Sequence, residues 1–215
     1  MSYTGQSVRR FEDARLVSGQ GSYVDDIKIP GMLHAAFLRS PHAHARIRSV
    51  DVAAALRMPG VEAVLTGDDI LGIVPDLPTR SMSGEWEVDE FKAPEHPALA
   101  VGKVSYVGQT VAVVVAQDPG QARDALELIQ VDYEPLPVVL DPWEAASSDS
   151  IPIHDELGTN VALRIHHDRQ GEDLDKAFAQ ADRIVEQRYD VQRLAPGPME
   201  TRGLVAHYQP EDDFL

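Results

Sequence analysis

The chain has 215 residues, with 19 Lys and Arg against 35 Asp and Glu, a formal net charge of −16, and 43% of its residues are hydrophobic. This composition is typical of a globular protein, and the acidic balance argues against nucleic acid and anionic membranes as partners. The chain contains no cysteine, which excludes disulfides, Cys-ligated metal centres and a thiolate nucleophile on it.

The N-terminal segment is predicted to be an irregular arm. Residues 1–30 are rich in Gly, Ser and Asp and lack the apolar stretch of a secretory signal. The longest clean apolar run, residues 111–116, is too short to span a bilayer. We therefore expect a cytoplasmic protein that does not enter a membrane.

The first structured part of the chain is predicted to alternate strands with one short helix. Residues 31–39 and 46–50 have strand character, Asp51 is a candidate N-cap for a helix over 52–58, and residues 61–66 form a β-rich run. Residues 75–97 carry four prolines among Ser, Gly and Glu, which indicates a long surface loop.

The clearest prediction concerns residues 110–136. The run 110–116 (TVAVVVA) is β-branched and apolar, so we expect a strand buried on both faces. Asp118-Pro119 is an N-cap followed by proline in the first helical turn, and apolar residues then recur on one helical face. Residues 131–136 regain β character, and this short crossover is compatible with an α+β arrangement as well as with a parallel pair.

The C-terminal third is predicted to begin a second domain. Asp141-Pro142 repeats the capping signal, and residues 147–149 have the composition of a linker. Beyond it we expect a strand over 161–165, a helix capped by Asp173, an alternating strand over 183–193, and a hairpin that starts at 204–208 and stops two residues into its second strand. Such a hairpin leaves backbone groups unpaired, so we interpret the chain as part of a longer polypeptide.

Few residues form a convergent chemical site. His42 and His44 would share one face of a strand and could chelate a metal, but they have no third ligand at a fixed spacing, so we interpret them as hydrogen-bonded surface histidines. The adjacent acids of Asp68-Asp69 and Asp212-Asp213 diverge, which favours turn or capping roles. Gly19-Gln20-Gly21 lacks the third glycine of a dinucleotide-binding loop, so we interpret it as a turn.

Glu200 and Arg202 lie two residues apart in an extended segment. They could share a face and build a polar site, or simply form an ion pair at the start of a strand.

Five stretches carry a recognisable pattern: GQSVRRFEDARLVSGQGSYVDDI (5–27), LRSPHAHARI (38–47), PGVEAVLTGDDI (59–70), VGQTVAVVVA (107–116) and APGPMETRG (195–203). In this order they resemble the molybdenum hydroxylases, the family of xanthine dehydrogenase, aldehyde oxidase and aerobic carbon monoxide dehydrogenase. The resemblance is to the start of the large, molybdenum-carrying subunit, and it covers nearly the whole chain.

The resemblance implies an α+β chain. Residues 1–146 would form an α/β hammerhead domain with its N-terminal arm, residues 147–165 a linker, and residues 166–215 the incomplete start of a molybdopterin-binding domain, with its opening strands and helix.

It also implies an oxidoreductase. In the family, a water-derived hydroxide on molybdenum attacks an electrophilic carbon, a glutamate acts as base, and electrons leave through iron–sulfur clusters to flavin. The pterin loops and the catalytic glutamate correspond to positions after residue 215, so no catalytic residue and no metal ligand is assigned here.

The motifs mark Gln109, Glu200 and Arg202 as candidate interface residues. No cofactor is expected on this chain alone, while the complete enzyme would contain a molybdopterin-type molybdenum cofactor. The implied partners are the remaining large-subunit polypeptide, an iron–sulfur subunit and an FAD subunit. The alternative is a stand-alone, non-catalytic binding or assembly module that reuses the hammerhead fold.

Overall fold

The computed structural model describes residues 3–78, 87–92, 94–166 and 174–209. The chain divides into two compact units. The larger unit comprises Leu33–Gln180, and the smaller unit combines Met1–Met32 with Ala181–Leu215.

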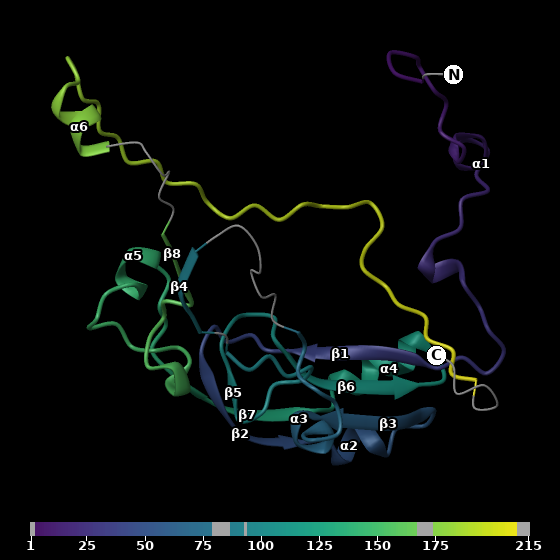
Figure 1. The fold of residues 1–215 in the computed structure, drawn as a ribbon. Coiled ribbons are helices and arrows are strands. Elements are labelled where there is room, and N and C mark those ends of the chain that lie inside the picture. The colour runs from purple at the N-terminus through teal and green to yellow at the C-terminus, as the bar shows by residue number, and fades with distance from the viewer. Residues whose placement is uncertain (1–2, 79–86, 93, 167–173, 210–215) are drawn as a thin grey trace. The chain divides into compact units, whose positions relative to one another are not determined.

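Two three-stranded antiparallel sheets form the centre of the larger unit (Figure 1). In the first, β6 (Thr110–Ala116) lies between β1 (His34–Arg39) and β3 (Val61–Thr66). In the second, β2 (Ala45–Asp51) lies between β5 (Lys103–Val104) and β7 (Gln130–Pro135). The five strands predicted over residues 31–136 are confirmed to within three residues at each end.

Helix α4 (Pro119–Leu126) covers one face of the first sheet and begins where the sequence predicts. The side chain of Asp118 accepts hydrogen bonds from the backbone N–H groups of Gly120 and Gln121, at 2.7 and 3.3 Å. Ala122 and Ala125 are buried against β6 together with Ala55 of α2 (Ala53–Leu56). The small side chains let this helix lie close to the sheet.

β6 is the most buried strand of the larger unit. Val111, Ala112, Val114 and Ala116 have no exposed surface, whereas Val113 and Val115 are half-buried. The prediction of burial on both faces therefore holds fully for the helix-covered face, and only partly for the other.

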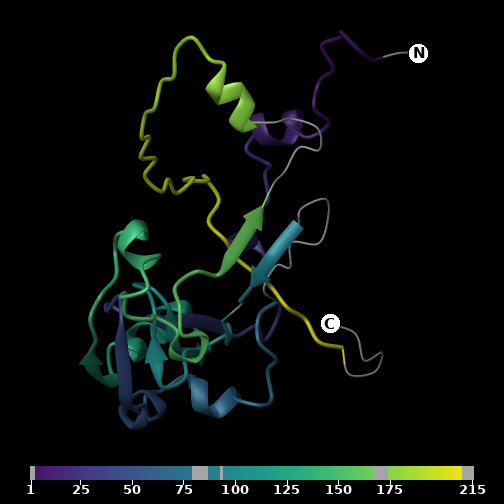
Figure 2. The same ribbon diagram turned by 60° about the vertical axis from the view of Figure 1, so that its left-hand side comes forward.

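The loop predicted over residues 75–97 is wrong in part, because residues at its centre form a strand. β4 (Glu87–Phe91) pairs antiparallel with β8 (Leu163–His166), with Glu87 opposite His166 (Figure 2). The surrounding prolines hid this strand, and its partner lies more than 70 residues away in the sequence.

Four short helical segments complete the larger unit. They are α3 (Gly67–Ile70), α5 (Pro142–Ala145), the 3₁₀ turn η2 (Asp155–Leu157) and α6 (Leu174–Ala179). Asp141 caps α5 through its carboxylate, as predicted. Asp173, the predicted cap of α6, lies outside the described residues. Among the helices of the described chain, none is long and apolar enough to cross a membrane.

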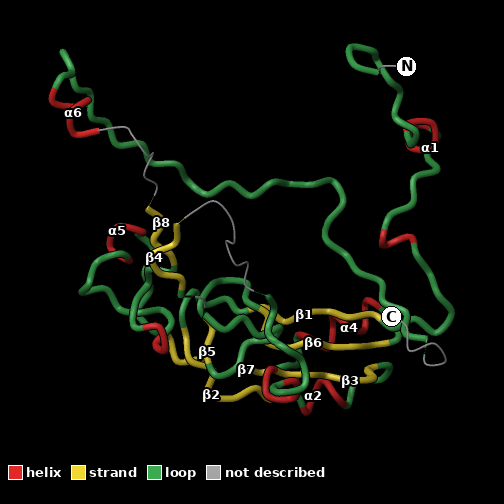
Figure 3. The backbone as a smooth tube through the Cα atoms, viewed as in Figure 1, coloured by secondary structure: helices red, strands yellow, loops and turns green. Residues whose placement is uncertain are grey.

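The smaller unit contains little regular structure (Figure 3). Its arm is irregular as predicted, apart from α1 (Asp13–Val17) and the 3₁₀ turn η1 (Val24–Asp26). The strands predicted over 183–193 and 204–208 are wrong, because both segments have no strand structure. No described strand supplies the hydrogen-bonding partners that a strand needs, and Val185, Tyr189 and Val191 are 82–89% exposed. The predicted turn and second strand at residues 210–215 lie outside the described residues.

Candidate functional site

Gln109 lies at the end of the turn between β5 and β6, directly before β6, and the end of β1 lies beside it. Its side-chain carbonyl accepts the backbone N–H of Ser105 at 2.7 Å, and its backbone carbonyl accepts the N–H of Ser40 at 2.9 Å. Ser40 accepts the N–H of Gly108 in return, at 2.8 Å. Gly108 has φ +87°, a conformation that favours glycine. Gln109 is buried. Through these hydrogen bonds it holds the segment around Ser105 to the segment around Ser40.

The histidines next to this turn are occupied by contacts within the protein. The ring of His42 packs against Tyr133, with 4.8 Å between the ring centroids. Burial raises the pKa of the Tyr133 phenol, and a hydrogen bond to Ser40 acts in the opposite direction. Within the described residues, no group of three or more His, Cys, Asp or Glu side chains is arranged to hold a metal.

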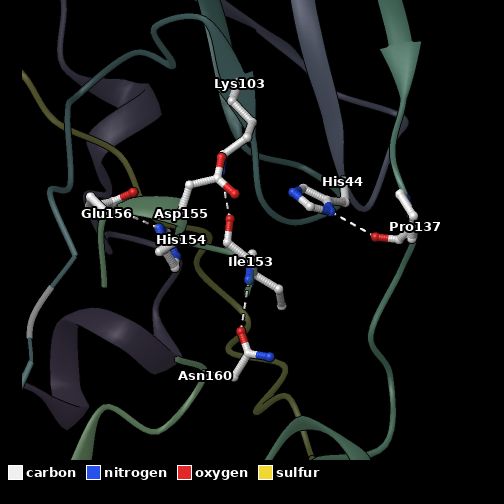
Figure 4. Close-up of polar contacts among 8 residues, drawn as sticks. All are labelled: His44, Lys103, Pro137, Ile153, His154, Asp155, Glu156 and Asn160. Carbon is white, nitrogen blue, oxygen red and sulfur yellow. Dashed lines mark hydrogen bonds and ion pairs between the residues drawn. The ribbon is translucent and has the colours of Figure 1, made fainter. Parts of the chain in front are cut away.

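His44 is buried, unlike the surface histidine expected from the sequence. Its Nδ1 donates to the carbonyl of Pro137 at 2.7 Å (Figure 4), because a carbonyl can only accept. In the neutral ring this places the proton on Nδ1 and leaves Nε2 as an acceptor. That Nε2 is buried and has no partner among the described residues.

Lys103 forms a second polar contact on the neighbouring strand. Its Nζ donates to the carbonyl of Ile153 at 2.7 Å and pairs with the carboxylate of Asp155 at 3.0 Å (Figure 4). The Lys103 side chain is only 18% exposed. The hydrogen bond and the charge of Lys103 lower the pKa of the Asp155 carboxyl, and Arg46 and His44 act in the same direction.

The segment that Lys103 holds is closed on itself by Asn160. The side-chain carbonyl of Asn160 accepts the N–H of Ile153 at 2.8 Å, and its NH₂ donates to Ile151 and Ser150. Residues 150–160 therefore form a compact loop, and Lys103 ties this loop to β5. The sequence did not predict these Lys103 contacts, because nothing in the local pattern links Lys103 to residues 50 positions away.

Glu200 holds the N-terminal arm inside the smaller unit. Its Oε1 accepts the backbone N–H of Val24 at 3.0 Å, at the start of η1. Gly203 lies close to the same residue, since an added Cβ would come within 2.8 Å of a Val24 methyl group. Val24 belongs to the motif at 5–27 and Glu200 to the motif at 195–203. The hydrogen bond between them therefore joins two motifs across 176 positions of the sequence.

A hollow of about 450 Å³ adjoins this contact. Its lining comes from η1 and the segment around Glu200: Tyr23, Val24, Asp25, Asp26, Met199, Glu200, Thr201 and Gly203. No ion pair joins Glu200 to Arg202 in the described part of the chain, so the ion-pair alternative is wrong. Gln109 belongs to the larger unit, whereas Glu200 and Arg202 belong to the smaller one.

Of the paired acids, Asp69 behaves as a cap. The carboxylate of Asp69 accepts the backbone N–H and the hydroxyl of Thr66, both at 2.7 Å, at the start of α3. These two hydrogen bonds lower the pKa of Asp69, the side-chain bond contributing more. Asp212 and Asp213 lie outside the described residues.

Comparison with known proteins identifies the family. Residues 18–137 match the family model for the a/b hammerhead domain of aldehyde oxidase and xanthine dehydrogenase, and residues 153–215 match the molybdopterin cofactor-binding domain. The chain belongs to the aldehyde oxidase and xanthine dehydrogenase family. The α+β class and the order of its two parts, inferred above from the five motifs, are confirmed.

Individual relatives agree with this assignment. The chain is 39% identical to the nicotine 6-hydroxylase large subunit of Paenarthrobacter nicotinovorans, over 98% of this chain and 25% of that protein. It is also 39% identical to the carbon monoxide dehydrogenase large chain of Afipia carboxidovorans, over 92% of this chain and 25% of that one. A crystal structure of a Cu,Mo-CO dehydrogenase superposes with a TM-score of 0.64 at 39% identity, covering 83% of this chain and 22% of that chain. The chain thus spans about a quarter of the length of the curated relatives it matches.

The region that matches the molybdopterin-binding domain leaves most of its described side chains exposed. Within the region that matches the molybdopterin-binding domain, residues 181–209 are exposed except for the half-buried Val205. The buried polar side-chain atoms without a partner in the described chain, His44 Nε2 and Gln121 Oε1, both belong to the hammerhead region. These residues do not fit the cofactor by themselves.

Proposed function

We propose that this chain is the N-terminal portion of the large subunit of a molybdenum-dependent hydroxylase or dehydrogenase. The complete enzyme would oxidise an aldehyde, an N-heterocycle or carbon monoxide with water-derived oxygen. The observation that supports this proposal is the succession of a hammerhead match over residues 18–137 and a molybdopterin-binding match from residue 153.

On this proposal the chain is inactive alone. The molybdenum cofactor belongs to the complete enzyme, and its binding requires further large-subunit polypeptide, because residues 181–209 leave their side chains exposed. An iron–sulfur subunit and an FAD subunit would carry electrons away. A cytoplasmic location is part of the same proposal.

The candidate residues take positioning roles in this scheme. Gln109 holds the turn between β5 and β6 to the end of β1, through its bonds with Ser105 and Ser40. Glu200 fixes the arm through Val24. Arg202 has no assigned contact and stays an interface candidate. We also propose 1–146, 147–165 and 166–215 as arm-plus-hammerhead, linker and incomplete second domain.

Metal analysis tests the proposal. The chain is produced in a host that makes molybdenum cofactor, once alone and once with the coding sequence that follows its last codon in the source DNA. We expect molybdenum and hydroxylase activity only in the second preparation. Stoichiometric molybdenum on residues 1–215 alone would contradict the proposal.

A stand-alone assembly module is the second candidate. It is favoured by the larger unit, in which both hydrophobic clusters are made of residues between 36 and 133. Co-purification discriminates the two: a stable monomer that recruits no complementing polypeptide supports the module.

A further inference from the structure

The segment between β7 and β8 is held at both of its ends beside the β2–β5 pair, by Lys103 of β5 and by His44, which directly precedes β2. His44 holds Pro137 at its beginning, and Lys103 holds Ile153 and Asp155 at its end. These anchors are neighbours, because Arg46 pairs with Lys103 and Ala45 pairs with Val104. Residues 137–155, called the anchored loop below, therefore leave the second sheet and return to it at almost the same place.

The anchored loop displays large apolar side chains to solvent. Leu140 is 85% exposed, Trp143 is 66% exposed and Val138 is 49% exposed. Asp141 and its proline neighbour fix the start of α5 between them. Neighbouring exposed apolar side chains are typical of protein-docking surfaces, and Trp is among the residues that supply most of the binding energy at such surfaces.

A hollow lies beside these side chains. Its volume is about 270 Å³, and its lining combines apolar and acidic residues: Val138, Val139, Glu144, Ser147, Asp149 and Ser150. Glu144 and Asp149 have exposed side chains. Residues 137–155 contain four acids and no Lys or Arg.

We propose that the anchored loop is a docking surface for a polypeptide partner that presents Arg or Lys beside an aliphatic side chain. The acidic charge of the loop favours such a partner. Arg or Lys of the partner would pair with Glu144 and Asp149, while its aliphatic side chain would enter between Val138 and Val139. A second copy of this chain is a poor occupant, since it carries the same acidic loop and a net charge of −16. The proposal goes beyond the enzymatic assignment and does not depend on it.

Tryptophan fluorescence tests the proposal directly. The chain has two tryptophans, so the Trp86→Phe variant leaves Trp143 as the only reporter. The probes are three synthetic twelve-residue peptides that alternate Leu with Arg, Leu with Glu, and Ser with Arg. We expect the Leu/Arg peptide to shift the Trp143 emission to shorter wavelength with saturation. The Leu/Glu peptide should give no shift, and the Ser/Arg peptide should bind about tenfold more weakly or worse.

Variants distinguish binding at the anchored loop from attraction to the net negative charge of the whole chain. The pair Glu144→Gln and Asp149→Asn should weaken Leu/Arg binding about threefold or more, since each substitution removes one exposed ion pair with the peptide. Leu140→Ser should weaken it about fivefold or more. The control pair Asp124→Asn and Glu127→Gln removes the same charge from exposed positions of α4 and its C-terminal end, and should leave binding unchanged.

Three results would overturn the proposal. The first is equal binding of the Leu/Arg and Leu/Glu peptides, and the second is equal weakening by the control pair. The third is concentration-dependent self-association in sedimentation that Leu140→Ser abolishes, because the occupant would then be a second copy. Thermal melting of each variant confirms that the exposed substitutions leave the fold intact.

Discussion

Strand β6 and residues 183–193 show what a strand-forming sequence needs besides its own pattern. Both segments are rich in β-branched or alternating apolar residues. β6 is paired on both sides, with β1 and β3, and helix α4 covers one face. Residues 183–193 have no strand structure and remain exposed. The two regions share a local propensity to form strands. They differ in that β6 has neighbouring strands and a helix to pack against, whereas residues 183–193 have neither among the described residues.

The largest expected effect comes from making the same change in both regions. Val114→Ala in β6 should lower the free energy of unfolding by about 2 kcal/mol, because two buried methyl groups are lost and a cavity remains. Val191→Ala should change it by less than about 0.5 kcal/mol, since Val191 is already exposed. Urea unfolding monitored by circular dichroism measures both. Equal losses would mean that residues 183–193 are packed in solution.

A smaller effect is expected at the cap of α4. Asp118→Ala removes the acceptor for two backbone N–H groups and should cost about 1 kcal/mol of stability. The control is Asp124→Ala, which lies on an exposed position of the same helix and has no assigned contact. If the control cost as much as the cap variant, the loss would reflect helix charge rather than capping.

The sequence predicted the larger unit well because its signals are local. The β-branched run 110–116, the Asp118-Pro119 cap and the apolar face of α4 each lie within a few residues, and the structure confirms all three. Strand β4 was missed because its partner β8 is distant and its neighbours are prolines.

The candidate site was predictable only in part, for a related reason. The motifs singled out Gln109 and Glu200, and both make long-range contacts, with Ser40 and Val24 respectively. The Lys103 contact with residues 153–155 was missed, because an isolated Lys and an isolated Asp carry no pairing information. Long-range polar contacts depend on the folded arrangement and leave no periodic signal in the sequence.

The hydrogen bond between Glu200 and the N-terminal arm tests whether the smaller unit contains a specific contact despite its exposed side chains. Glu200→Gln keeps an acceptor but removes the charge, and Glu200→Ala removes both. Because Glu200 accepts the Val24 N–H, hydrogen exchange at that amide should accelerate about tenfold in the Ala variant and less in the Gln variant. Arg202→Ala is the matched control within the same motif and should leave that amide unchanged. The same acceleration in the Arg202 variant would assign the protection to the segment as a whole.

The smallest expected effect is a pH dependence confined to the anchored loop. Lys103 lowers the pKa of Asp155 in the folded protein, so the contact is fully present above the ordinary carboxyl pKa and is lost as the pH falls through the lowered value. Lys103→Met removes both the charge and the hydrogen bonds, and the Asp155 pKa should rise toward its usual range. NMR titration of the Asp155 carboxyl measures this shift directly, and hydrogen exchange at residues 151–157 should become faster at neutral pH. Arg48→Met is a suitable control, because Arg48 lies on β2 and pairs with Glu134 instead. Unchanged hydrogen exchange at residues 151–157 in the Lys103 variant would contradict this prediction. It would show that the Asn160 hydrogen bonds hold the loop without any contribution from Lys103.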